Sequence, residues 1–230
     1  MTRHKHYELR NTGSALREIV FGMEDGMVST LGAITGIAVG SQDHYTVLLA
    51  GIVIISVESI SMGIGSYLAS KSQDDLRKRV IREEKEEIRD YPREEKHELH
   101  GFLIRDGWPE SIADQMVDAA NRDDKLMLKE MQYRELNISS QGGNSLQNGI
   151  KMFLSYVVGG LIALFAYFFL PISTAMILSI IVTLVGLFTL GAITSRYTKV
   201  SWRKSGLRIL LLGGIALAIG LIVGELVKVS

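Results

Sequence analysis

The chain has 230 residues and a formal net charge of zero, with 47% hydrophobic and 22% charged residues. It contains no cysteine, which excludes disulfides, zinc–thiolate sites, iron–sulfur clusters and cysteine nucleophiles. Charge is segregated along the chain: residues 71–140 contain 18 acidic and 14 basic residues, whereas residues 151–230 are mostly apolar. This segregation predicts membrane spans joined to a charged insert.

Five stretches are long and apolar enough to cross a hydrocarbon core of about 30 Å, which needs roughly 20 helical residues. They lie near residues 15–40, 46–70, 150–170, 173–195 and 206–228. Glu18, Glu24 and Asp25 interrupt the first stretch, and Glu58 lies within the second. The sequence therefore predicts an all-α membrane protein with five transmembrane helices.

The orientation of these spans follows from the positions of Lys and Arg. The N-terminal tail is basic, and the loop after the fourth span carries Arg196, Lys199, Arg203, Lys204 and Arg208. The loops QDHY and LPIS contain neither Lys nor Arg. By the positive-inside rule, the N-terminus and residues 71–149 are predicted to be cytoplasmic and the C-terminus to lie on the far side. The absence of a targeting extension favours a prokaryotic plasma membrane over a vacuolar membrane.

The insert between the second and third spans is predicted to form three helices. The first continues the second span from residue 71 to about residue 90, where Pro92 marks a turn. A second helix covers about Arg93 to Arg105 and is ended by Asp106 and Gly107. Pro109 suits the first turn of a third helix, which continues to about Leu136 before a linker, SSQGGNSLQN. The predicted parts are residues 1–70, with the tail and two spans, 71–149, a cytoplasmic domain with its linker, and 150–230, with three spans.

Glycines recur every four residues in the first span, at Gly22 and Gly26 and then at Gly32, Gly36 and Gly40. This spacing predicts close helix–helix packing in the membrane. An odd number of spans with such faces also suits a homodimer. The chain has no nucleotide-binding loop of the G-x-x-x-x-G-K-[ST] type, and nothing in it predicts a nucleic-acid partner or an enzyme.

Acidic residues within the spans are candidate functional groups. Glu58 lies about 18 Å from the cytoplasmic end of its span, where an ionised side chain costs at least about 3 kcal/mol. Met62 follows one turn later on the same face, and an antiparallel neighbour would bring Asp25 to a level between the two. Two carboxylates and a thioether suit a borderline-soft divalent cation and could exchange protons with it. The alternative is a protonated structural Glu58 with Asp25 near the membrane interface.

The insert contains two pairs of acids on either side of Pro92, Glu84-x-x-Glu87 and Glu95-x-x-Glu98. Each pair occupies one helical face, and an antiparallel turn would bring the faces together, where the carboxylates repel unless they are protonated or bridged by cations. Met131 and Glu135 have i,i+4 spacing on the predicted third helix. The alternative is a salt-bridged, solvated surface, since so many acids produce E-x-x-E spacing by chance.

Taken together, these residues resemble the vacuolar iron transporter family of divalent iron and manganese exporters. The resemblance spans nearly the whole chain and rests on GMEDGMVSTLGAITG, SISMGIGSYLASKSQ, the two E-x-x-E pairs around the Pro turn, and EMQYREL. It implies five spans, a cytoplasmic three-helix metal-binding domain, a dimer, and export of ferrous iron in exchange for protons.

The resemblance also implies roles for individual residues. Asp25 and Met62 match the membrane pathway of the family, and the cytoplasmic ligands match Glu84, Glu87, Glu95, Glu98, Met131 and Glu135. Two positions depart from the usual pattern. Ser66 stands where the family has an acid after the glycine, for which Glu58 is a candidate replacement, and Gln132 stands where some members have a second methionine.

The resulting hypothesis is transport of Fe²⁺ out of the cytoplasm by proton antiport, with the insert collecting the ion and Asp25, Glu58 and Met62 passing it through the membrane. Mn²⁺, Co²⁺ and Zn²⁺ are further candidate substrates, and no prosthetic group is expected. The alternative is a membrane-anchored iron-binding, di-iron oxidase or storage protein without transport. Glu94-x-x-His97 has the spacing of di-iron bundle ligands and is the feature that suggests it.

Overall fold

The computed structural model describes residues 5–136 and 144–227, without the side chains of residues 5–15 and Thr198. The described elements are all helical: α1 (Lys5–Ser41), α2 (His44–Asp90), α3 (Pro92–Arg105), α4 (Glu110–Ala120), α5 (Asp124–Arg134), α6 (Ser145–Leu164), the 3-10 helix η1 (Phe165–Phe168), α7 (Ile172–Thr198) and α8 (Trp202–Leu226). The chain divides into unit 1, Met1–Leu68 with Asn144–Ser230, and unit 2, Ala69–Gly143. The boundary falls inside α2.

Four helical segments of the described chain are long and apolar enough to cross a membrane, namely those in α2, α6 with η1, α7 and α8. They match the second to fifth predicted spans, and the all-helical prediction is confirmed. The predicted first span forms part of α1 but does not reach the same apolar composition, because its N-terminal half carries Arg17, Glu18, Glu24 and Asp25.

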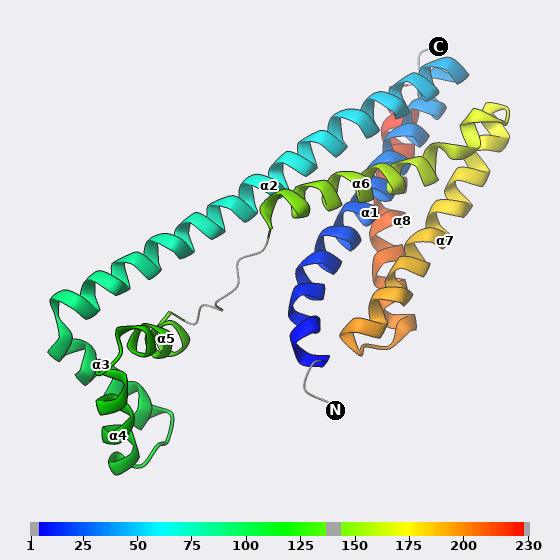
Figure 1. Cartoon of the computed structure of the whole chain (residues 1–230). Coiled ribbons are helices and arrows are strands. Elements are labelled where there is room, and N and C mark those ends of the chain that lie inside the picture. The colour runs from blue at the N-terminus through cyan, green and yellow to red at the C-terminus, as the bar shows by residue number, and fades with distance from the viewer. Residues whose placement is uncertain (1–4, 137–143, 228–230) are drawn as a thin grey trace. The chain divides into compact units, whose positions relative to one another are not determined.

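Although the apolar segment of α1 falls short of the composition of the other four, α1 forms part of the core of unit 1. Its Met27, Leu31 and Ile34 are at most 1% exposed, and it packs against α6, α7 and α8 (Figure 1). A helix with protein neighbours on several sides does not need a continuous apolar surface. Composition alone therefore underestimates how deeply such a helix is buried.

Close contacts between glycines give the directions of the helices in unit 1. Gly32 and Gly36 of α1 lie against Ala216 and Gly220 of α8, so these two helices run in the same direction. At Gly36, an added Cβ would lie 2.7 Å from the Gly220 carbonyl oxygen, so the backbones are too close for any larger residue. The predicted close packing of this glycine series is therefore confirmed.

Glycine contacts also give the directions of α6 and α2 relative to α1. Gly22 lies against Met152 near the start of α6, and Gly26 lies against Tyr156 one turn later, so α1 and α6 run in the same direction. Gly63 of α2 lies against Phe153 of α6, whereas Gly51 lies against its last residue, Leu164, so α2 runs in the opposite direction. Thus α1, α6 and α8 run in one direction and α2 runs in the other.

Unit 2 contains the end of α2 together with α3, α4 and α5, around its own apolar core. The fully buried residues of this core include Leu99, Leu103 and Met131. The predicted second helix is confirmed as α3, and Gly107 follows it with φ +92°, a left-handed conformation that favours glycine.

The predicted third helix of the insert is wrong, because α4 and α5 are separate helices. The chain turns at Asn121–Asp123, where the Asp123 side chain accepts a hydrogen bond of 2.9 Å from the Lys125 amide and caps α5. Asn and Asp favour such breaks because their side chains bond the nearby backbone. Of the predicted linker at 139–148, residues 139–143 lie outside the described residues, and α6 already begins at Ser145.

Candidate functional site

Two carboxylates of unit 1 lie within electrostatic reach of each other, one on α1 and one on α2. Asp25 and Glu58 lie close enough to repel each other, and both act electrostatically on the hydroxyl group of Tyr156. Tyr156 is fully buried, and its hydroxyl lies 2.6 Å from the Ser29 hydroxyl. We call Asp25 and Glu58 the membrane acid pair. The nearby hydroxyl groups can donate hydrogen bonds to these carboxylates or to the ligands of a bound ion.

The backbone around the membrane acid pair is unusually compact. An added Cβ at Gly26 would lie 3.0 Å from the Gly160 amide nitrogen of α6. The Ser29 hydroxyl also donates to the Asp25 carbonyl oxygen over 2.7 Å. These contacts hold α1 against α6, so the position of Asp25 is determined by helix packing as well as by its own rotamer.

The two acids differ in exposure within the single chain. Asp25 is partly buried between helices, whereas Glu58 lies on an exposed face of α2 among apolar side chains such as Val57 and Ile60. A charged group on a lipid-facing surface is unfavourable, and such residues normally face protein or a water-filled cavity. Met62, one turn from Glu58, is partly buried and joins the pair only through its i,i+4 spacing.

A third acid of unit 1, Glu18, was not among the predicted site residues. Its side chain is buried, accepts a hydrogen bond of 2.7 Å from the Ser66 hydroxyl and pairs with Arg17 at 2.7 Å. At Ser66, where the sequence resemblance led us to expect an acid, the carboxylate beside the hydroxyl comes from α1. The spacing of seven residues, two helical turns, between Glu18 and Asp25 was the signal that could have revealed it.

The predicted acids of unit 2 come together in one group, defined here as the carboxylate cluster: Glu84, Glu87, Glu95, Glu98 and Glu135. Burial, followed by repulsion from Glu135 and Glu95, raises the pKa of Glu84 to about 8. Burial and repulsion from Glu98 raise the pKa of Glu95 to about 7. Burial also raises the pKa of Glu135, with Glu98 the next cause. The cluster therefore disfavours a full set of negative charges.

Basic side chains do not relieve this repulsion. The ion pairs of unit 2 within the described residues use other acids, for example Arg79 with Glu83 and Arg134 with Asp106 and Glu130. One oxygen each of Glu84 and Glu95 is buried without a hydrogen-bond partner. Buried oxygens without donors are the groups that a cation or a proton would satisfy. The alternative of a salt-bridged, solvated surface therefore does not describe Glu84 and Glu95, whereas Glu87, Glu98 and Glu135 are exposed.

The geometry as it stands does not close around a metal ion. Across residues 5–136 and 144–227, no three His, Asp or Glu side chains form a group that could hold one. Met131 lies in the apolar core of unit 2, one turn before Glu135, whose amide bonds the Met131 carbonyl oxygen over 2.9 Å. The role of the carboxylate cluster and Met131 as ligands stays a prediction.

Unit 1 is a bundle of apolar helices with ionisable side chains, and unit 2 contains clustered carboxylates. These features are typical of a polytopic membrane protein that binds or transports cations. The sequence model of the VIT family matches residues 16–225, and the chain belongs to this family.

Three relatives illustrate the match. The chain is 32% identical to a protein named vacuolar iron transporter from Centaurea cyanus, covering 95% of this chain and 89% of the relative. It is 31% identical to vacuolar iron transporter 1 from Tulipa gesneriana, covering 93% and 88%. It is 28% identical to the vacuolar iron transporter of Plasmodium falciparum, covering 97% and 86%. These are the names of transporters rather than enzymes. The predicted resemblance to the vacuolar iron transporter family is confirmed.

Proposed function

We propose that this chain moves ferrous iron out of the cytoplasm in exchange for protons, with the membrane acid pair as the transport site. The observation that carries the proposal is the meeting of Asp25 and Glu58 on neighbouring helices, beside the buried Tyr156 hydroxyl. Carboxylate oxygens bind divalent cations, and the thioether of Met62 would favour a softer ion such as Fe²⁺ over Mg²⁺ or Ca²⁺. Protons compete with metal for the same oxygens, which couples the two flows.

In this proposal the carboxylate cluster of unit 2 collects the ion from the cytoplasm. Its acids repel one another and lack basic partners, so a divalent cation relieves the repulsion and satisfies the unpaired oxygens of Glu84 and Glu95. Met131 of α5 and Glu135, directly after α5, complete the proposed ligand set. Mn²⁺, Co²⁺ and Zn²⁺ are secondary candidates because oxygen and thioether ligands bind them as well.

The proposed assembly is a homodimer. Glu58 is exposed on the single chain although it belongs to a membrane-spanning segment. A second copy that covered this face of α2 would remove the acid from lipid and place the pathway between protein surfaces. The proposed orientation has the N-terminus and unit 2 in the cytoplasm. The sequence favours the plasma membrane, whereas the names of the relatives say vacuolar.

The proposal is tested by Fe²⁺ flux into proteoliposomes with and without an imposed pH gradient. We expect the unaltered chain to show flux that the gradient accelerates, and Asp25→Asn and Glu58→Gln to lose both the flux and its pH dependence. Ser56→Ala is the matched control on α2, because the Ser56 hydroxyl bonds only the Ile52 carbonyl oxygen of its own helix. Unchanged flux in both acid variants would contradict the site.

The alternative, a membrane-anchored iron oxidase or store, predicts a different result from the same preparation. The full chain would bind or oxidise Fe²⁺ at the carboxylate cluster without moving it across the bilayer. The membrane acid pair argues against this function, because an anchor alone has no use for acids among its spans.

A further inference from the structure

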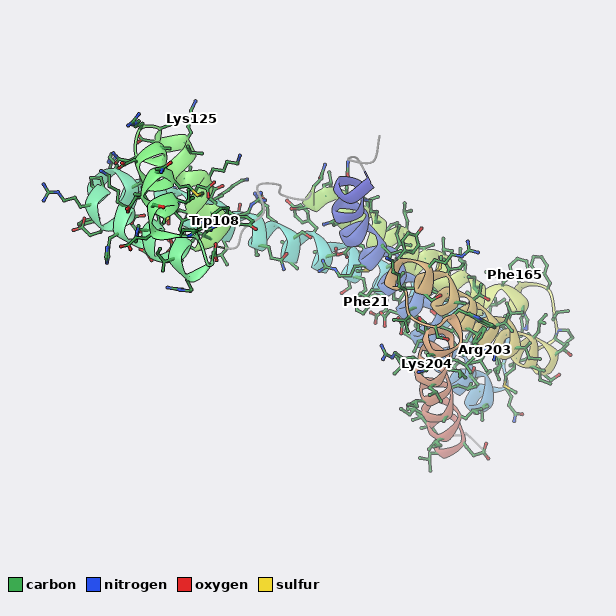
Figure 2. All side chains as sticks on the ribbon, turned by 90° about the horizontal axis from the view of Figure 1, so that it is seen from below. Phe21, Trp108, Lys125, Phe165, Arg203 and Lys204 are labelled. Carbon is green, nitrogen blue, oxygen red and sulfur yellow. The ribbon has the colours of Figure 1, made fainter. Side chains whose placement is uncertain are left out.

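The turn between α7 and α8 concentrates positive charge that the transport proposal does not use. It carries five basic residues, all exposed: Arg196, Lys199, Arg203, Lys204 and Arg208. No acidic residue occurs from residue 171 to residue 224. In the described part of the chain, none of the five forms an ion pair. Figure 2 labels Arg203 and Lys204 where α7 meets α8.

Helix stability explains Arg196, which lies in the last turn of α7 where cations are favourable, but not the basic residues at the start of α8. Arg203 and Lys204 occupy the first turn of α8, where the partial positive charge of the helix N-terminus disfavours cations. That turn contains no acid, and Ser201 makes no side-chain capping bond. The two basic residues therefore raise the local positive potential, and no acidic side chain of the described residues pairs with them.

Two exposed aromatic side chains lie among the basic residues in the sequence. Trp202 and Tyr197 are about half exposed, at 51% and 54%. The Trp202 ring lies edge-on to Phe188 with centroids 6.0 Å apart, and the Arg203 guanidinium lies 5.2 Å from the centre of the Trp202 ring. Trp and Tyr favour the boundary between lipid tails and water, and α7 and α8 both have the length and composition of membrane spans.

The backbone fixes this surface in place. An added Cβ at Gly191 of α7 would lie 2.7 Å from the Ser205 carbonyl oxygen of α8, and one at Gly206 would lie 2.7 Å from the Phe188 ring. The two helices are thus in close contact directly beside the turn. Trp202 is consequently held by Phe188 at a defined position relative to the span.

We propose that this surface, formed by the five basic residues with Tyr197 and Trp202, binds the phosphate headgroup of an anionic phospholipid. Exposed Lys and Arg at the end of a span attract anionic lipid by about 1 kcal/mol each. The half-exposed aromatic rings give the adjoining acyl chains an apolar surface, which a free phosphate ion would not use. The proposal depends only on the membrane location of α7 and α8 and is independent of what the chain transports.

The test uses Trp202 as a reporter in the full chain. Trp108 of unit 2 is the other of the two tryptophans, so a Trp108→Phe chain reports on Trp202 alone. This chain is reconstituted into phosphatidylcholine vesicles that contain an equal mole fraction of either brominated phosphatidylglycerol or brominated phosphatidylcholine. We expect stronger quenching of Trp202 fluorescence by the brominated anionic lipid, and equal quenching by the two would overturn the proposal without any further variant.

The charge dependence is then measured with Lys204→Gln and Arg208→Gln together, which leave Arg203 over the Trp202 ring. We expect the preference for anionic lipid to fall about tenfold or more, while quenching by brominated phosphatidylcholine shows that Trp202 remains in the membrane. Lys125→Gln with Lys129→Gln removes the same charge from exposed positions of unit 2 and should leave the preference intact (Figure 2 labels Lys125). An unchanged preference in the Lys204 and Arg208 variant would overturn the proposal.

Loss of the preference on adding inorganic phosphate at constant ionic strength would assign the surface to free phosphate instead and would also overturn it.

Discussion

The interacting acids of unit 1 are two and lie near hydroxyl groups, whereas those of unit 2 are five and repel one another. Asp25 and Glu58 are only two carboxylates, with Tyr156 and Ser29 at hand. The carboxylate cluster has five acids and unpaired buried oxygens. In the proposed function, the first arrangement exchanges one ion for protons, and the second is stabilised when a bound cation relieves its repulsion. This difference suits a pathway and a collector, respectively.

The two units also differ in what holds their helices together. Unit 1 combines apolar clusters with close backbone contacts at glycines, as between Gly36 and Gly220, whereas unit 2 has an apolar core with residues such as Leu99 and no such glycine contact at Gly101 or Gly107. Helices in a membrane gain little from burying apolar groups, so close backbone approach must supply the attraction there. In water, the hydrophobic effect does so.

The largest effect is expected from Gly220→Ala, which would break the packing of unit 1. The added methyl group would overlap the Gly32 carbonyl oxygen of α1, and backbone cannot move aside cheaply. We expect a loss of about 3 kcal/mol or more in the free energy of unfolding, measured by thermal unfolding in detergent. Gly214→Ala on the same helix meets nothing within 4 Å and should be neutral or slightly stabilising. Equal losses in both variants would contradict the packing account.

Metal binding is expected to respond most strongly to the buried members of the carboxylate cluster. Glu84→Gln keeps the size of the side chain but removes a charge, and we expect metal affinity to fall about 10- to 100-fold. Titration calorimetry of the full chain with Mn²⁺, an air-stable stand-in for Fe²⁺, measures it. Glu86→Gln changes an exposed acid of the same helix and should leave the affinity unchanged. If the two variants behave alike, the cluster is not the binding site.

The stability of metal-free unit 2 should decrease as pH rises. Because folding raises the pKa of Glu84 to about 8 and that of Glu95 to about 7 from 4.5, the folded unit binds these protons more tightly than the unfolded chain. Its free energy of unfolding is therefore highest below the unfolded value and falls as pH rises through the folded values. Trp108 fluorescence in a Trp202→Phe chain reports on unit 2 during unfolding.

Two perturbations sharpen the pH prediction. Glu84→Gln should flatten the dependence because it removes the group with the largest shift, and a divalent metal should restore stability above pH 8. Stability that rises with pH in the metal-free chain would show that the carboxylates are paired rather than mutually repelled.

The smallest effect is expected at the ion pairs of unit 2. The Arg134 side chain is 9% exposed and joins Asp106, at the end of α3, to Glu130 of α5. Arg134→Gln should lower the free energy of unfolding by about 1 kcal/mol, since partly buried pairs exceed exposed ones. Arg89→Gln is the matched control, because Arg89 is 73% exposed and pairs only with its neighbour Asp90. A larger loss at Arg89 would reverse the assignment.

Sequence reasoning predicted features set by local spacing and failed where tertiary contacts decide. Hydropathy located the four most apolar spans, and the Pro turn placed the two E-x-x-E pairs on facing helices. The same method merged α4 and α5, because an Asp such as Asp123 can lie within a helix as well as at its N-cap. It also missed Glu18, whose importance rests on Ser66, 48 residues away. Glu58 was predicted to be deep in the membrane, but its exposure on the single chain could not be derived from spacing.

The central claim, that unit 2 collects the ion and unit 1 moves it, is tested most directly by Fe²⁺ flux measured over a range of Fe²⁺ concentrations in proteoliposomes. The account predicts that Glu84→Gln raises the half-saturating concentration while nearly preserving the maximal flux, and that Asp25→Asn abolishes the maximal flux at any concentration. Full maximal flux in Asp25→Asn, or loss of flux at saturating iron in Glu84→Gln, would contradict it.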